Sequence, residues 1–199
     1  MPSIAEAEAL DLLADDRLVA FPTETVWGIA ARAASPAAID RLRAFKGARD
    51  HKAFSILVES AERAAEVAAD WDEPERSLGA AFWPGPLTLV VKCGRRLAPG
   101  VAAADGSVGL RCSPHPVARS LAEGSQRRGL GPVTATSLNR SGEPPARNRE
   151  EAESVCRDEI AMMAGEAGGE AASTVVDTTS GSLRVLREGA IPREALETR

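Results

Sequence analysis

The sequence predicts an α/β fold in which helices pack on one twisted, mixed β-sheet. Short runs rich in Val and Leu are typical of strands, and segments with apolar residues at helical spacing lie between many of them. The runs 87–92 and 107–112 follow each other without a helix between them. A regular alternation of strands and helices is therefore not expected, and the sheet should be mixed.

Size and composition narrow the classes of protein that fit. The 199 residues are enough to bury the core of a single domain over residues 1–199. No apolar run reaches about 18 residues, and the acidic N-terminus lacks the basic start of a secretory signal. We therefore expect no membrane span and a cytoplasmic location. The net charge of −5 disfavours a protein that coats nucleic acid through bulk charge, so an anion site must be a local basic cluster.

Local signals place the elements. Ser3 and Glu6 fit a capping box, Ser35-Pro36 fits a helix start, and Ser60 should open the helix that runs to Ala69. The segment 161–172, rich in Ala, Gly and Glu, is expected to be a mobile loop. Further helices are predicted at 73–82, 114–123 and 148–159 and after Pro192. Strands are predicted at 18–21, 26–31, 54–58, 87–92, 107–112, 132–136, 174–177 and 183–187.

Polar residues gather where the predicted strands and one helix end. In the strand 107–111, Ser107 and Arg111 share a face by alternation, and an inward Arg must be paired or must bind an anion. Each cluster alone also fits an ordinary turn or a solvated helix end. Together they predict a pocket for a polyphosphate, in which cations neutralise charge and hydroxyls orient oxygens. The clusters are Thr23-Glu24-Thr25, 46-KGARDHK-52, Ser107–Arg111, 134-TATSLNRSGEPPAR-147, and Ser173-Thr174 with Arg187.

Other chemistries have less support. The sequence has neither a GxxxxGK[ST] loop nor a GxGxxG motif, so a nucleotide would be bound outside those two families. The histidines are His51 and His115, and no His/Cys set has metal-ligand spacing, so no metal site made by protein alone is expected. The three cysteines are expected to be reduced thiols. Trp27, beside the Thr23–Thr25 loop, is the tryptophan expected to face a ligand.

These segments together resemble one family, the threonylcarbamoyl-AMP synthases built on the YrdC-like domain. They occur in the family's order and at similar spacing, from residue 18 to about 192. Because the sequence stops at the end of this domain, the expected likeness is to the family's short, single-domain members. The resemblance implies a YrdC-like twisted mixed β-sheet with flanking helices around a deep basic cavity. It rests on 22-PTETVWG-28, Lys46-Gly47, 83-WPGPLT-88, 107-SVGLR-111, 137-SLNRSGEP-144 and 173-STVVD-177 with Arg187.

The resemblance also implies a reaction. ATP, L-threonine and bicarbonate or CO2 would give threonylcarbamoyl-AMP and pyrophosphate, with Mg2+ accompanying ATP. A downstream threonylcarbamoyl transferase would then modify tRNA, and a weak contact of this protein with tRNA or other RNA is a further expectation. Threonine binding is implied for Thr25, Arg111, Ser137 and Ser173. ATP binding is implied for Lys52, Ser107, Asn139, Arg147 and Arg187, and a place beside the reacting groups for Lys46 and Arg49.

One departure keeps alternatives open. The family commonly has Lys-Gly-Arg-Pro where this chain has Lys46-Gly47-Ala48-Arg49. We predict that Arg49 still enters the cavity, with Lys52 as a second cation at the rim, because Gly47 can turn the chain and Arg is long. The alternative is that Arg49 faces solvent. At the level of function, the alternatives are a YrdC-like paralogue with another substrate and an RNA-binding module without synthase activity.

Overall fold

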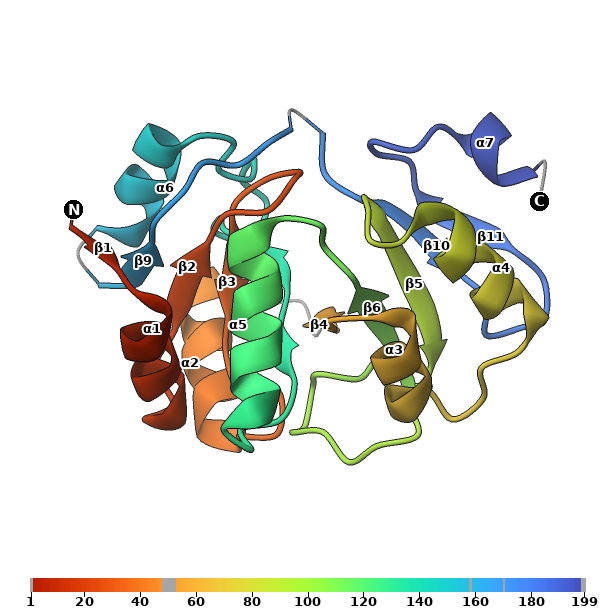
Figure 1. Cartoon of the computed structure of the whole chain (residues 1–199), viewed down its shortest axis with the longest axis horizontal. Coiled ribbons are helices and arrows are strands. Elements are labelled where there is room, and N and C mark those ends of the chain that lie inside the picture. Colours follow the sequence, from red (N-terminus) through yellow and green to blue (C-terminus); the bar gives the residue numbers. More distant parts are fainter. Residues whose placement is uncertain (1, 48–52, 158, 170, 198–199) are drawn as a thin grey trace.

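The computed structural model describes residues 2–47, 53–157, 159–169 and 171–197, and it shows a mixed α/β fold built on two β-sheets (Figure 1). One sheet has the strand order β1-β9-β2-β3-β8 and the other the order β11-β10-β5-β6-β4-β7. The strands are β1 (Ser3–Ile4), β2 (Val19–Phe21), β3 (Gly28–Ala30), β4 (Ile56–Leu57), β5 (Leu87–Lys92), β6 (Ser107–Arg111), β7 (Val133–Thr134), β8 (Thr136–Ser137), β9 (Ala161–Met163), β10 (Thr174–Asp177) and β11 (Arg184–Arg187). The helices are α1 (Glu6–Ala14), α2 (Pro36–Lys46), α3 (Ala61–Val67), α4 (Glu73–Phe82), α5 (Pro116–Arg127), α6 (Arg149–Cys156) and α7 (Arg193–Glu197).

The prediction of a single sheet was wrong, and the segment 133–137 explains why. Its first part, β7, pairs antiparallel with β4, whereas its second part, β8, pairs antiparallel with β3 of the other sheet. Between them, the Ala135 amide donates to the Ser55 carbonyl at 2.7 Å, and at the end of β7 the Thr134 amide donates to the Ala31 carbonyl at 2.9 Å. The expected strand 132–136 therefore exchanges partners midway and joins the two sheets.

Two further expectations, for the N-terminus and for the segment 161–172, also need correction. Ser3 does not cap a helix, because Ser3 and Ile4 form β1, and α1 follows Ala5 without a side-chain cap. The segment expected to be a mobile loop contains β9, which lies between β1 and β2 and is parallel to both. Met162 in β9 is fully buried, so packing supplies the order that the composition did not indicate.

Other helix boundaries follow their predicted signals. The Ser35 hydroxyl accepts from the Ala38 amide at the start of α2, and the Ser60 hydroxyl accepts from the Arg63 amide at the start of α3. At the other end of α2, Gly47 has φ 63°, a left-handed conformation that glycine adopts without steric cost. The chain therefore turns immediately after Lys46.

The core follows the two-sheet plan. On one side, α1 and α5 cover the first sheet through residues such as Leu13 and Leu121, which pack with Phe21 (Figure 1). A larger apolar cluster includes Trp27 and Leu89 and extends over both sheets. Within the described part of the chain, no helix is long and apolar enough to cross a membrane.

Candidate active site

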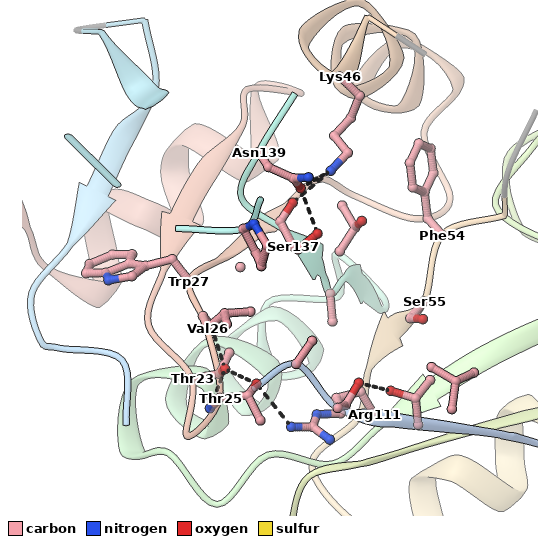
Figure 2. A pocket seen from close by; sticks show the side chains of 18 of the residues that line it. Thr23, Thr25, Val26, Trp27, Lys46, Phe54, Ser55, Arg111, Ser137 and Asn139 are labelled. Atoms are coloured by element: carbon pink, nitrogen blue, oxygen red, sulfur yellow. Dashed lines mark hydrogen bonds between the residues drawn. The ribbon is translucent and has the colours of Figure 1, made fainter. Parts of the chain in front are cut away.

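A cavity of about 560 Å³ has walls formed by both sheets (Figure 2). The first sheet contributes the loop between β2 and β3, together with β8. The second contributes residues of β4, β5, β6, β10 and β11, and the end of α2 adds Lys46. The lining contains hydroxyl, amide and cationic groups together with apolar side chains. The predicted site residues that line it are Thr25, Lys46, Arg111, Ser137, Asn139, Ser173 and Arg187.

One row of residues across the six-stranded sheet carries much of this wall, and we call it the transverse row. Arg111 of β6 lies opposite Thr88 of β5 on one side and Leu57 of β4 on the other. Val175 of β10 is the partner of Thr88 and also of Arg187 on β11. Residues paired across strands project from the same face of a sheet. Two cations, a hydroxyl and two apolar groups therefore lie side by side along one wall.

Arg111 is the most buried cation of the site, with a side chain 6% exposed. Its Nη2 group pairs with the Glu24 carboxylate and lies 3.5 Å from the Thr25 hydroxyl. Its Nη1 group is buried and has no hydrogen-bond partner among the described residues. Burial lowers the pKa of Arg111 to about 9, whereas contact with a carboxylate favours the charged form. A buried cationic donor without a partner is suited to an anionic ligand.

Lys46 is a second cationic centre of the site, and Figure 2 shows it at the opposite end of the view from Arg111. Its ammonium group donates to the Ser137 carbonyl at 2.9 Å and to the Asn139 side-chain oxygen at 2.7 Å. The same Asn139 oxygen accepts from the Ser137 hydroxyl at 2.7 Å, and the Asn139 amide group donates to the Glu143 carbonyl. Burial lowers the pKa of Lys46 from 10.5 to about 8. The network fixes Lys46 while its third proton stays available to a ligand.

The loop between β2 and β3 is held by its own hydroxyls. The Thr23 hydroxyl lies 2.9 Å from the Thr25 hydroxyl and donates to the Val26 carbonyl at 2.7 Å. Trp27 follows this loop and is among the residues that line the cavity, but its ring is fully buried and points away from the labelled polar cluster in Figure 2. The expectation that the Trp27 ring faces a ligand is therefore not supported by this arrangement.

A third polar group lies at the β11 end of the transverse row. The Arg187 guanidinium donates to the Ser173 carbonyl at 2.8 Å and to its hydroxyl at 3.2 Å. The Ser173 hydroxyl is also 2.8 Å from that of Thr88. Arg187 itself stays exposed, so it is a cation at the rim and its guanidinium is accessible to a ligand entering from solvent.

Other predicted residues have different places. The Ser107 hydroxyl donates to Asp105 at 2.6 Å and does not line the cavity. Arg147 is exposed, pairs with Glu151 at 3.3 Å, and is likewise absent from the lining. Arg49 and Lys52 lie outside the described residues, so the prediction that Arg49 enters the cavity stays a prediction.

Some lining residues were not among the predicted contacts. Thr88 and Ser55 line the cavity, and Glu24 lies behind Arg111. Glu24 and Thr88 belong to motifs that the sequence analysis quoted, but their contacts depend on strand register and loop packing. No group of three or more His, Cys, Asp and Glu side chains placed to hold a metal ion occurs within the described ranges. The three cysteines are free.

The fold and the cavity define an α/β protein with a cation-lined pocket for a small ligand. The chain belongs to the Sua5/YciO/YrdC family, whose model, described as "Telomere recombination", matches residues 11–189.

Individual relatives agree with this assignment. The chain is 37% identical to a Mycobacterium tuberculosis protein over 182 residues, which cover 90% of this chain and 82% of that protein. It is 32% identical to a threonylcarbamoyl-AMP synthase of Chromohalobacter salexigens, covering 88% of this chain and 93% of the relative. Among solved structures, the Sua5 protein of Pyrococcus abyssi complexed with L-threonine superposes with a TM-score of 0.89 at 31% identity. That superposition covers 99% of this chain and 58% of the Pyrococcus abyssi chain.

Proposed function

We propose that this protein is a threonylcarbamoyl-AMP synthase, which makes threonylcarbamoyl-AMP and pyrophosphate from ATP, L-threonine and bicarbonate or CO2. The observation that carries the proposal is the placement of Lys46, Arg111 and Arg187 on the walls of one cavity whose hydroxyls come from both sheets. The relatives named threonylcarbamoyl-AMP synthase support the choice of reaction. A cavity of about 560 Å³ is within the usual range for small-molecule sites.

The chemistry needs positioning and charge neutralisation more than a nucleophilic side chain. The neutral amine of threonine attacks the carbon of CO2 and loses a proton, which gives an N-carboxylate. Starting from bicarbonate, the same bond forms and water is released. An oxygen of the carboxylate then attacks the α-phosphorus of ATP, and the bond to the bridging oxygen breaks to release pyrophosphate. Fixed cations and hydroxyls stabilise the charge that develops on these oxygens.

Two parts of the cavity suit two substrates. Arg111, with its buried free Nη1 and the neighbouring Thr25 hydroxyl, is assigned to the threonine carboxylate. Ser137 and Ser173 also line the cavity and are assigned to the polar groups of threonine. Asn139 and Arg187 are assigned to ATP, and Lys46 to the carboxylate and phosphate oxygens between the substrates. Ser107 and Arg147 lie outside the lining, so the nucleotide assignment rests on Asn139 and Arg187.

The side chains that line the cavity offer few carboxylate ligands for the proposed Mg2+. The lining includes one carboxylate, that of Glu143, so the described residues do not form a cage for a divalent cation. Mg2+ would accordingly be held mainly by the phosphate oxygens of ATP, where it shares their charge. The tRNA-modifying transferase that would take the threonylcarbamoyl group, the direct contact with tRNA and the cytoplasmic location are parts of the same proposal.

Release of pyrophosphate from ATP tests the proposed reaction. The expected result is release that requires both L-threonine and bicarbonate, with mass-spectrometric detection of threonylcarbamoyl-AMP. A protein that binds ATP but releases no pyrophosphate under these conditions would contradict the proposal and would favour a paralogue with another substrate. Binding of RNA without any turnover would instead favour the RNA-binding module.

A further inference from the structure

Glu24 lies beside the cavity but not on its wall. Its carboxylate accepts a hydrogen bond from Nη2 of Arg111 through one oxygen and from the Ser113 hydroxyl through the other. The Glu24 side chain is 18% exposed and is absent from the lining, so a ligand in the cavity meets Arg111 and not Glu24. The carboxylate therefore contacts the guanidinium from behind.

The partners of Glu24 are themselves fixed. Ser113 is 1% exposed, and its oxygen accepts from the His115 amide at 3.2 Å, close to the start of α5. On the backbone side, Gly168 and Gly169 donate to the Thr23 and Thr25 carbonyls, each at 2.9 Å. A side chain on Gly169 would come within 2.8 Å of the Glu24 carbonyl, so this close approach requires glycine. Both ends of the Glu24 side chain are thus held in place.

The two nitrogens at the end of Arg111 consequently have different surroundings. Nη2 has Glu24 and Thr25 as neighbours, whereas the buried Nη1 has no partner among the described residues. An arginine side chain is long and has many rotamers, so a contact that fixes one edge of the guanidinium decides where the other edge points. The negative charge of Glu24 also favours the charged state of a guanidinium that is removed from water.

We propose that Glu24 is a positioning residue, which holds Arg111 through Nη2 so that Nη1 faces the carboxylate of the amino-acid substrate. Ser113 supports the same arrangement by holding the second oxygen of Glu24. This inference rests on the proposed function in one respect, the assignment of L-threonine to Arg111. Glu24 itself touches no reacting atom.

Equilibrium titration with L-threonine tests the inference without turnover, in the wild type and in Glu24→Ala and Glu24→Gln. Loss of a hydrogen bond to a charged group predicts that Glu24→Ala weakens threonine binding about tenfold or more. Glu24→Gln should recover part of this loss, because its amide oxygen still accepts from Arg111 while its amide nitrogen cannot accept from Ser113. Titration with a non-hydrolysable ATP analogue should give unchanged affinity in both variants.

A matched control is Glu66→Gln, which alters a Glu that accepts from Arg63 at 2.7 Å on the exposed face of α3. Parallel losses of threonine and ATP affinity would mean a general structural role and would overturn the inference, as would unchanged threonine affinity in Glu24→Ala. Thermal denaturation checks folding, and Glu24→Gln keeps the test decisive if Glu24→Ala is unstable. Threonine binding by a wild type that releases no pyrophosphate would contradict the proposed function alone.

Discussion

The ammonium group of Lys46 donates a hydrogen bond to the side-chain oxygen of Asn139 at 2.7 Å, across 93 positions of the sequence. This contact joins the last residue of α2 to the loop that follows β8. Asn139 is also bonded to Ser137 and to the Glu143 carbonyl, so its amide orientation is fixed from three directions. The position of Lys46 in the cavity therefore depends on the first sheet as much as on its own helix.

The burial of Lys46 predicts a particular pH dependence of stability. Its pKa is lowered from 10.5 to about 8, so between these values the unfolded chain binds more protons at this site than the folded chain. The free energy of unfolding should therefore rise with pH across this window through the Lys46 contribution. Lys46→Met lacks the titrating group and should lack that rise. Urea unfolding of both proteins from pH 7 to 10.5 measures the difference.

Lys92→Met provides the control for this experiment, because Lys92 has a side chain 43% exposed and lies outside the cavity lining. A constant difference in unfolding free energy between wild type and Lys46→Met at every pH would show that folding does not lower the pKa of this amine.

Arg187 is predicted to contribute to ATP binding. Its guanidinium is held by Ser173 and remains exposed at the rim, where it can meet a phosphate. Loss of a charge-assisted contact should weaken binding by about 1.5–3 kcal/mol in Arg187→Ala. Calorimetric titration with a non-hydrolysable ATP analogue gives the affinity, and Asn139→Ala should weaken it as well. Arg184→Ala is the matched control, because Arg184 lies on the same strand and pairs with Asp177 at 2.7 Å. Equal affinity of Arg187→Ala and wild type for the ATP analogue would show that Arg187 does not contribute to ATP binding.

Leu57 is predicted to favour threonine over serine. It is 3% exposed, lines the cavity and neighbours Arg111 in the transverse row, where the substrate's methyl group can contact it. One buried methyl group contributes about 1–1.5 kcal/mol, so the ratio of kcat/KM for the two substrates should be roughly tenfold in the wild type. The ratio should fall in Leu57→Ala and less in Leu57→Val, and pyrophosphate release with each amino acid measures it.

Val175→Ala is the control for this prediction, because Val175 is separated from Arg111 by Thr88 in the same row. An unchanged ratio in folded Leu57 variants would exclude Leu57 as the methyl contact. A wild-type ratio above about 1,000 would contradict any mechanism based on a single methyl group.

Arg49 is predicted to contribute more to activity than Lys52. The left-handed conformation of Gly47 turns the chain after α2, as the sequence predicted, and a long Arg side chain can then reach back to the cavity. Arg49→Ala should lower pyrophosphate release at sub-saturating ATP and threonine more than Lys52→Ala does. Full activity of Arg49→Ala would identify Arg49 as a surface residue and would strengthen the case for a paralogue with another substrate.

Elements with a local signal could be predicted from the sequence. Ser35 and Ser60 act as helix caps, and the runs 87–92 and 107–112 contain the adjacent antiparallel strands β5 and β6. The strand β9 could not be predicted, because its order comes from parallel neighbours that are distant in sequence. The division into two sheets could not be predicted either, because no local sequence signal indicates that the segment 133–137 changes its strand partners.

The candidate site, like the fold, could be predicted only where a local sequence signal was present. Arg111 was predicted because an arginine on an inward strand face needs a partner or an anion. Thr88 and Leu57 became recognisable as its neighbours once the register across three strands was known. Glu24 belongs to a turn that the sequence marked as polar, yet its contact with Arg111 joins positions 87 residues apart. Ser107 shares a strand face with Arg111, but its hydroxyl is bonded to Asp105.

The segment 133–137 connects the two sheets, so ligand binding beside it should affect how the sheets move relative to each other. It hydrogen-bonds to strands of both sheets, and the cavity beside it is lined by residues of both. A ligand that contacts Ser137 and Arg111 together would act as a non-covalent cross-link between the sheets. Sub-global opening that separates them would then require ligand release, so bound substrates should slow amide hydrogen exchange in β3 and β6 in concert. Exchange kinetics would thus report substrate binding far from the residues that touch the substrate.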